Sequence, residues 1–235
     1  MSAQIEMLSQ QQHAMLARPA ENGDKRTFPY TMQNSSSNSI PTPTQINHLD
    51  LAIEPITSSA FEVFFEYLND HLADNGKPEN VYFQPLPYAE SVFSAERAKA
   101  FPDALDIPLG EPGWRRLWGA FTHGRKLLGH IDLRANSDRF AAHRCLLGMG
   151  VDRSFRKFGL GQRLIEYAEK WALKSGTLKW IDLQVLSVNE PAIRLYQRSG
   201  FTKTGEVPEM FEIDGHLFSY TSMAKRVMVN SSDVL

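Results

Sequence analysis

Regular patterns of apolar and polar residues run from about residue 47 to about residue 228. Alternation between the two kinds predicts strands, and apolar residues three or four apart predict amphipathic helices. Strands are expected over residues 49–56, 115–122, 126–135, 143–151, 178–188, 201–213 and 216–227. Helices are expected over residues 58–72, 94–101, 159–176 and 191–200. These elements predict an α/β (α+β) fold with about six to seven strands and about four helices.

Local signals mark where several of these elements begin and end. The clearest apolar stripe lies on the helix expected over 159–176 and consists of Leu160, Leu164, Ile165, Ala168 and Trp171. Gly176 follows its last turn, which is typical of a helix C-cap. A serine is expected to cap the helix over 58–72. Asp214 and Gly215 separate the last two strands and predict a hairpin turn.

The chain divides into three parts by composition. Residues 1–45 are rich in Gln, Ser, Asn, Pro and Thr, so a flexible polar tail is expected there. Residues 46–228 form the predicted folded domain, and residues 229–235 a short C-terminal tail. Within the domain, residues 78–112 are rich in proline. A long irregular stretch of this kind is a candidate for substrate binding.

Composition and charge indicate which partners the protein binds and in which compartment it is found. The formal net charge of −2 excludes an overall basic field, so neither nucleic acid nor an anionic membrane surface is expected as a partner. The single cysteine, Cys145, lies in an apolar run and rules out an intrachain disulfide. We expect no metal site, no membrane span and no signal peptide, and therefore a cytoplasmic protein.

The segment from Val151 to Arg163 joins a strand to a helix through basic residues and glycines. Arg156, Lys157 and Phe158 lead into Gly159-Leu160-Gly161, where the helix begins. Unpaired backbone N–H groups and the positive end of the helix dipole meet at such a point. The glycines allow a ligand to approach the backbone closely, so this segment predicts a cradle for a pyrophosphate.

Other glycine motifs fit this segment less well. A P-loop needs Gly-Lys followed by Ser or Thr, but Gly161 is followed by Gln162 and Arg163. A Rossmann fingerprint needs a third glycine, where this chain has Leu164. Glycines that merely cap and turn the chain remain the alternative for a lone Gly-x-Gly pair.

A second motif follows further along the chain. Asn189 is followed by Ala192, by Tyr196 and then by a Gly-Phe pair that opens the next strand. Together with the segment from Arg156 to Gly161, it resembles in order and spacing the two signatures of the GNAT superfamily of N-acetyltransferases. The resemblance covers roughly residues 47–228.

This resemblance implies a mixed, mostly antiparallel sheet that is splayed at an acetyl-CoA cleft. It also implies an enzyme, an N-acetyltransferase, that transfers the acetyl group of acetyl-CoA to a primary amine by direct attack in a ternary complex. The amine is carried by a small molecule, a peptide or a protein. The alternative is a catalytically silent module that binds acyl-CoA. Either a monomer or a homodimer is compatible with the resemblance.

The resemblance also assigns residues to the co-substrate. The backbone groups of Met149 and Val151 would bind the pantetheine arm, and Gly148 and Gly150 indicate either a strand bulge or a ligand close to the backbone. The pyrophosphate would be held by Arg156, Lys157, Phe158, Gly159, Leu160, Gly161 and Gln162, with Arg163 as a further positive charge. Asn189 would bind the pantetheine, and Tyr196 would lie beside the sulfur.

For catalysis, the resemblance makes Tyr196 the proton donor to the departing thiolate. The base that deprotonates the amine is sought on the strands that flank the cleft. Asp182 and Asp132 rank first and His143 is a further candidate. The alternative is that each aspartate pairs with a neighbouring arginine, Arg144 or Arg134. Candidate contacts to the acceptor amine are the acidic residues Glu209, Glu212 and Asp214 and the aromatic residues Tyr82, Phe83, Tyr88, Phe93 and Trp114.

Overall fold

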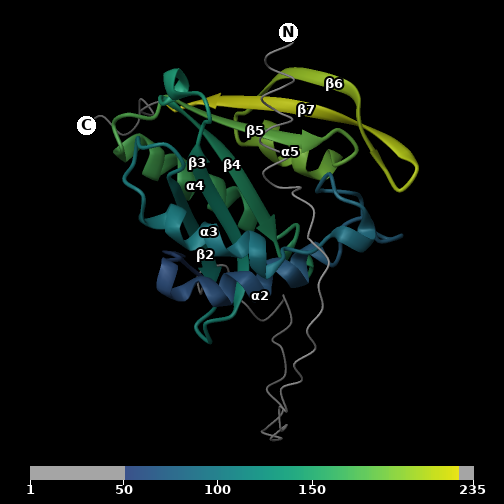
Figure 1. Cartoon of the computed structure of the whole chain (residues 1–235), viewed down its shortest axis with the longest axis horizontal. Coiled ribbons are helices and arrows are strands. Elements are labelled where there is room, and N and C mark those ends of the chain that lie inside the picture. The colour runs from purple at the N-terminus through teal and green to yellow at the C-terminus, as the bar shows by residue number, and fades with distance from the viewer. Residues whose placement is uncertain (1–50, 228–235) are drawn as a thin grey trace, which may run out of the picture. The chain divides into compact units, whose positions relative to one another are not determined.

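A computed structural model describes residues 51–227, which form one open seven-stranded sheet with helices on both faces (Figure 1). The strands are β1 (Ala52–Pro55), β2 (Arg115–Phe121), β3 (Leu127–Ala135), β4 (Arg144–Val151), β5 (Trp180–Leu186), β6 (Thr202–Ile213) and β7 (His216–Arg226). The helices are α2 (Phe61–Leu72), α3 (Ala95–Asp106), α4 (Leu160–Lys174) and α5 (Glu190–Arg198). The tails predicted over residues 1–45 and 229–235 lie outside the described residues.

The sheet has the order β1-β2-β3-β4-β5-β7-β6 and is antiparallel except between β4 and β5. This agrees with the prediction of a mixed, mostly antiparallel sheet. The parallel pair ends early, because its last aligned residues are Leu146 and Asp182. Beyond that point β4 stays paired with β3 as far as Val151, and β5 stays paired with β7 as far as Leu186. The sheet therefore opens into a gap between the C-terminal halves of β4 and β5, as expected.

The two faces of the sheet are covered by different helices. On β3, the Cα of Gly129 faces α4, because a Cβ there would lie 3.1 Å from Leu164 Cδ1. The next residue, His130, points to the other face, where its ring lies 5.0 Å from that of Phe64 on α2. Apolar side chains of α2, α3 and the neighbouring strands form the core of this second face: Ile56, Phe61, Phe64, Tyr67, Leu105, Leu117, Phe121 and Leu127.

Two helix boundaries differ from the sequence predictions. Ser58–Ala60 forms a 3-10 turn, so α2 begins at Phe61 and its N-cap, Ala60, has no capping side chain. The predicted serine cap is therefore wrong. Helix α3 continues through Pro102 to Asp106, five residues beyond the predicted end at Phe101. Packing of Phe101 and Leu105 against the α2 core accounts for this extension, since proline alone would disfavour it.

The proline-rich segment after α2 is folded around one buried amide. Asn75 is fully buried, and its Nδ2 donates to Gln84 O, Leu86 O and Ser91 Oγ, while its Oδ1 accepts from the N–H groups of Phe83 and Gln84. The segment also contacts the β6–β7 turn, where Asp214 accepts from Tyr82 Oη at 2.6 Å and from Tyr88 N at 2.9 Å.

Within residues 51–227, no helix combines the length and apolar character that crossing a membrane requires.

Candidate active site

The backbone of β4 faces the gap at Met149 and Val151. The N–H of Asp152 donates to Leu128 O on β3 at 2.8 Å. Because backbone groups alternate in direction along an antiparallel pair, the N–H and C=O groups of Met149 and Val151 point away from β3. They point toward the side from which β5 has diverged. Of these groups, Val151 O accepts a hydrogen bond of 3.3 Å from Arg156 Nε.

Of the two predictions for Gly148 and Gly150, a strand bulge is wrong. The β3–β4 register runs without interruption from Gly129–Val151 to Ala135–Cys145, so there is no bulge in this pair. A Cβ at residue 148 would collide with Asp132 Oδ1. A Cβ at residue 150 would lie 2.8 Å from both His130 Cε1 and His71 Nε2. Both glycines therefore make room for polar side chains of β3 and α2 on the α2-facing side of the strand.

The loop after β4 ends in an open helix N-terminus. Gly159 is the N-cap of α4, with φ of 79°, and supplies no capping side chain. The N–H of Arg163 donates to Gly159 O at 3.2 Å and makes the first helical hydrogen bond. The N–H groups of Leu160, Gly161 and Gln162 precede it and have no partner within the helix. A Cβ at Gly159 would meet nothing within 4 Å, so the space beside this N-cap residue is open.

The side chains of this loop differ in where they lie. Arg156 folds back to Val151 O, next to the gap. Lys157, with φ of 69°, and Phe158 are exposed. Arg163 is turned away from the helix N-terminus, because its Nη2 donates to Leu51 O at 3.1 Å. It therefore does not add its charge to the cradle in the way the sequence suggested.

Gly161 lies where α4 and α5 meet. A Cβ on this residue would lie 2.8 Å from Leu195 Cδ2 and 3.4 Å from Met149 Cε. The side chain of Gln162 joins the same two helices, since its Oε1 accepts from Ser199 Oγ at 2.8 Å. These contacts close one face of the β4–β5 gap.

Helix α5 follows β5, with Asn189 at its N-terminus and Tyr196 near its C-terminus. Asn189 is its N-cap and accepts a hydrogen bond of 3.3 Å from the N–H of Ala192. Tyr196 is 8% exposed and packs edge-on against Phe201. Burial raises the pKa of Tyr196 above its ordinary value, with a smaller contribution from Tyr220. The phenol is therefore protonated at neutral pH.

Both candidate aspartates make ion pairs. Asp132 lies opposite Gly148 at the start of the gap, 3.2 Å from Arg134 Nη1 and 3.5 Å from Arg115 Nε. Asp182 lies at the last β4–β5 pair and forms two hydrogen bonds with Arg144, one of 2.7 Å from Nε and a second from Nη2. The alternative weighed from the sequence, pairing with neighbouring arginines, is thus what both side chains do.

His143 and Cys145, which the sequence analysis also considered, lie at the end of β4 where it is paired with β5. His143 is exposed and precedes β4. Cys145 is fully buried, and burial raises the pKa of its thiol to about 12. The thiol therefore stays protonated.

Sequence reasoning missed a cluster of three residues on the α2 face of the gap, Tyr67, His71 and His130. The rings of Tyr67 and His71 stack with centroids 6.0 Å apart, and His130 meets both edge-on at 5.5 and 6.3 Å. His130 and Tyr67 are 6% and 8% exposed. Burial lowers the pKa of His71 to about 3 and that of His130 to about 4. Both imidazoles are therefore neutral at pH 7.

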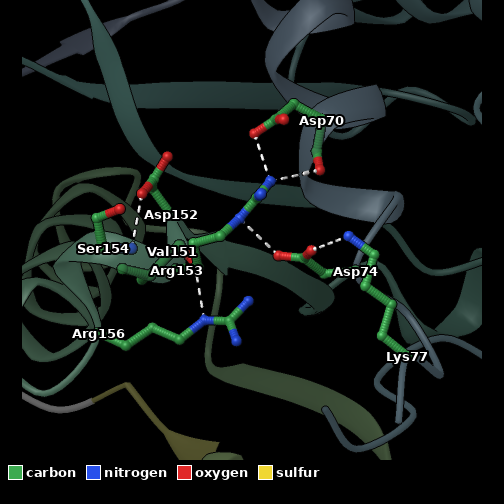
Figure 2. A network of polar contacts seen from close by, with 8 residues as sticks. All are labelled: Asp70, Asp74, Lys77, Val151, Asp152, Arg153, Ser154 and Arg156. Atoms are coloured by element: carbon green, nitrogen blue, oxygen red, sulfur yellow. Dashed lines mark hydrogen bonds and ion pairs between the residues drawn. The ribbon is translucent and has the colours of Figure 1, made fainter. Parts of the chain in front are cut away.

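The loop after β4 is tied to the end of α2 by an ion-pair network (Figure 2). Arg153 Nη2 donates to Asp70 O at 3.0 Å and to its Oδ2 at 2.7 Å, while Arg153 Nε lies 2.7 Å from Asp74 Oδ2. Lys77 Nζ donates to Asp74 Oδ1 at 2.9 Å. The cradle loop and the helix that carries His71 are thus fixed relative to each other.

The residues considered for acceptor contact are scattered. Trp114 packs on Trp171 of α4, and Phe93 packs on Phe65 and Phe101 in the α2 core. Glu209 and Glu212 are exposed on the edge strand β6. Tyr82, Tyr88 and Asp214 join the proline-rich segment to the β6–β7 turn. Of the five aromatic side chains, Phe83 contacts the histidine cluster, with its ring 4.8 Å from that of His71.

Among residues 51–227, no three His, Cys, Asp or Glu side chains are grouped so that they could hold a metal ion.

Comparison with known proteins places this architecture in a family. Residues 82–201 match the model of the Acetyltransferase (GNAT) family. The streptothricin acetyltransferase of Escherichia coli is 36% identical over 88 residues, which are 37% of this chain and 48% of that protein. The match thus spans about half the length of this curated relative.

Solved structures share the fold at low identity. An acetyltransferase of the GNAT family from Streptococcus pneumoniae aligns with a TM-score of 0.64 and 22% identity, over 76% of this chain and 99% of that one. The spermidine N-acetyltransferase of Vibrio cholerae, in complex with CoA and spermine, aligns with a TM-score of 0.59 and 16% identity, over 77% and 97% of the two chains. The family match, which covers just over half of the chain, shows that this protein belongs to the acetyltransferase (GNAT) family.

Proposed function

We propose that this protein is an N-acetyltransferase that transfers the acetyl group of acetyl-CoA directly to a primary amine in a ternary complex, through its domain over residues 46–228. One observation carries the proposal: the parallel β4–β5 pair ends at Leu146 and Asp182, and both strands lead to helix N-termini at the open end. Ligands of α/β sheets bind outside the carboxyl ends of strands at such a point.

The residues at the open end fit the chemistry of CoA. The uncapped N–H groups of Leu160, Gly161 and Gln162 suit a diphosphate, since the helix dipole favours negative charge there. The backbone of Lys157, Phe158 and Gly159 would form the rest of the cradle, with the guanidinium of Arg156 as a source of positive charge. The amide-containing pantetheine arm would pair with the backbone of Met149 and Val151 and with the side chain of Asn189. No metal ion enters this scheme.

Tyr196 is proposed as the proton donor to the departing thiolate. Its phenol is protonated at neutral pH because burial raises its pKa. No hydrogen bond to another residue of the described chain occupies its hydroxyl. The N–H of Met149 faces the gap and is the proposed donor to the oxyanion. Binding both substrates side by side would supply much of the rate, so no covalent enzyme intermediate is needed.

Asp132 and Asp182 are proposed to act on the site through the arginines they hold. Asp132 lies at the start of the gap and keeps Arg115 and Arg134 beside it. Asp182 anchors Arg144 across the last β4–β5 pair, where the strands begin to part. Replacing each by asparagine tests this assignment against a direct role as the base, because loss of a base would remove its ionisation from the dependence of the rate on pH.

The names of two relatives suggest the first acceptors. One is a streptothricin acetyltransferase and another a spermidine N-acetyltransferase. Streptothricin and spermidine, both of which carry primary amines, therefore head the panel of acceptors, followed by peptide N-termini and lysine side chains.

The test begins with calorimetric titration of acetyl-CoA into the full chain, followed by the amine panel with Tyr196→Phe as control. Micromolar binding, acetylation of one amine class and a lower kcat for Tyr196→Phe are expected. Binding without turnover of any amine would instead identify a silent acyl-CoA-binding module. Absence of binding would overturn both assignments.

A further inference from the structure

We propose that His71 accepts the proton of the attacking amine, and that Tyr67 and His130 complete the pocket that binds this amine. The inference rests on the proposed acetyltransferase function and names the proton acceptor within it. None of these three residues belongs to the motifs that carry the family resemblance.

The first argument is position. His71 Nε2 and His130 Cε1 both lie 2.8 Å from the place of a Cβ on Gly150. Gly150 stands between Met149 and Val151, whose backbone groups face the β4–β5 gap. The two imidazoles therefore lie directly over the segment of β4 along which the thioester arm is proposed to run, on the face opposite α4.

The second argument is unused hydrogen-bonding capacity. Tyr67 Oη and His130 Nδ1 are buried and have no hydrogen-bond partner among the described residues. Leaving such buried groups without a partner is unfavourable, because the water they lose on burial is not replaced. Residues 51–227 also supply no hydrogen-bond partner to the ring nitrogens of His71, which is partly exposed. These three neighbouring side chains can therefore both donate hydrogen bonds to a ligand and accept them from it. A primary amine, which has N–H groups and a lone pair, is such a ligand.

The third argument is charge. His71 faces His130, Arg156, Arg153 and Asp74, and His130 faces Asp132 and Arg115. Burial and these cations lower the pKa of both imidazoles, so each is neutral at pH 7 with a lone pair available, and a base this weak takes a proton only from the acidic nitrogen formed after attack. The pocket walls are aromatic, from Phe64 and Phe83, so the amine enters in its neutral form rather than as a cation.

The proton balance is complete without another reagent. The amine nitrogen attacks the thioester carbonyl, a C–N bond forms and the nitrogen becomes cationic and acidic. His71 Nε2 takes one proton from this nitrogen as the C–S bond breaks, and Tyr196 gives its proton to the sulfur. The proton on His71 then returns to Tyr196 through solvent, which restores both side chains.

Chemical modification tests the position without any acceptor. Diethyl pyrocarbonate acylates neutral imidazoles, so partly exposed His71 reacts, as do exposed His123 and His216. Saturating acetyl-CoA is expected to slow the reaction of His71 at least fivefold and to leave His216 unchanged, as followed by peptide mass spectrometry. Adenosine 3′,5′-bisphosphate, which lacks the pantetheine arm, should give no protection. Undiminished acylation of His71 in a complex whose formation calorimetry has verified would overturn the inference.

Variants test the proton transfer, with propylamine as a small probe amine. His71→Gln should bind acetyl-CoA as the unaltered protein does, yet lose aminolysis by about 10²-fold or more at pH 7. Its rate should rise with pH as the amine loses its own proton. His123→Gln, in the exposed β2–β3 turn, should show no change. An aminolysis rate of His71→Gln within threefold of that of the unaltered protein, with acetyl-CoA binding retained, would contradict the proposed role.

Tyr67→Phe separates a functional from a packing role. Removing an unpaired buried hydroxyl is expected to leave the melting temperature unchanged or higher. The KM for propylamine should nevertheless rise several-fold if this hydroxyl contacts the amine. Retained stability together with an unchanged KM would remove Tyr67 from the pocket. If the unaltered protein does not bind acetyl-CoA, the acetyltransferase proposal itself is wrong.

Discussion

The Cδ2 atom of Leu195 lies 2.8 Å from the position that a Cβ on Gly161 would occupy. Helix α5 therefore packs against the backbone of α4 at this residue, and glycine is required for the packing. A bulky residue at 161 would disturb the helix pair itself, so it would not report on phosphate binding alone.

Gly161→Ala should lower the free energy of unfolding. Overpacking costs about 1–3 kcal/mol, and the higher helix propensity of alanine offsets up to about 1 kcal/mol. Urea unfolding of the single variants and of the Gly161→Ala, Leu195→Ala double variant measures the effect. The double variant should be more stable than the sum of the two changes predicts, because shortening Leu195 makes room for the new methyl group. Strict additivity would refute the close contact.

Gly159 offers the cleaner test of the cradle, because a side chain there meets open space. Asparagine and aspartate both tolerate a positive φ better than most residues and have nearly the same shape. Gly159→Asp places a negative charge before the helix N-terminus and should weaken acetyl-CoA binding at least tenfold relative to Gly159→Asn. Calorimetry on both variants makes the comparison. Equal affinities would show that no anion binds at this point.

Arg153 contacts two carboxylates (Figure 2), of which one is buried and one is exposed. The side chain of Asp74 is 3% exposed, whereas that of Asp70 is 64% exposed. Arg153→Gln leaves Asp74 with Lys77 as its remaining cation and should cost about 1–3 kcal/mol of stability. Asp70→Asn should cost less than about 1 kcal/mol. Chemical unfolding of both variants compares their losses of stability. Equal losses would contradict the difference in burial between Asp74 and Asp70.

Glu206 gives the fold a pH dependence that can be measured. Hydrogen bonds from Lys203, Thr221 and Ser187 lower its pKa from 4.5 to about 2. The folded state therefore binds this proton more weakly than the unfolded chain, and the stabilisation is lost as the pH falls from about 4.5 toward 2. Glu206→Gln should be less stable than the unaltered protein at pH 7, and the difference should shrink below pH 4. A constant difference between pH 7 and pH 3 would contradict the lowered pKa.

Local sequence patterns predicted the elements and the helix N-terminus at Gly159 because both depend on neighbouring residues. The helix beginning near Gly159, the C-terminal Gly176 and the turn at Asp214 and Gly215 follow from local backbone geometry. The prediction that α3 ends at Phe101 was wrong for the opposite reason. Packing of Phe101 and Leu105 against the core stabilises the helix more than Pro102 destabilises it.

The histidine cluster depended on contacts between distant parts of the chain. His71 lies on a helix and His130 on a strand, and no spacing in the sequence relates them. The available signal was the pair Gly148 and Gly150, which was assigned to a bulge or a ligand. The structure excludes the bulge and shows that these glycines lie beneath the side chains of His71, His130 and Asp132.

The short β4–β5 pairing also has a mechanical consequence. The sheet consists of two parts, strands β1 to β4 and strands β5, β7 and β6. The hydrogen bonds between these parts end at Leu146 and Asp182, and α4 packs against α5 beside this point. A molecule that forms hydrogen bonds with β4 beyond Leu146 would connect the two parts of the sheet where their own hydrogen bonds stop. Such a ligand becomes a structural member of the folded state, and saturating it should stiffen the whole domain against unfolding.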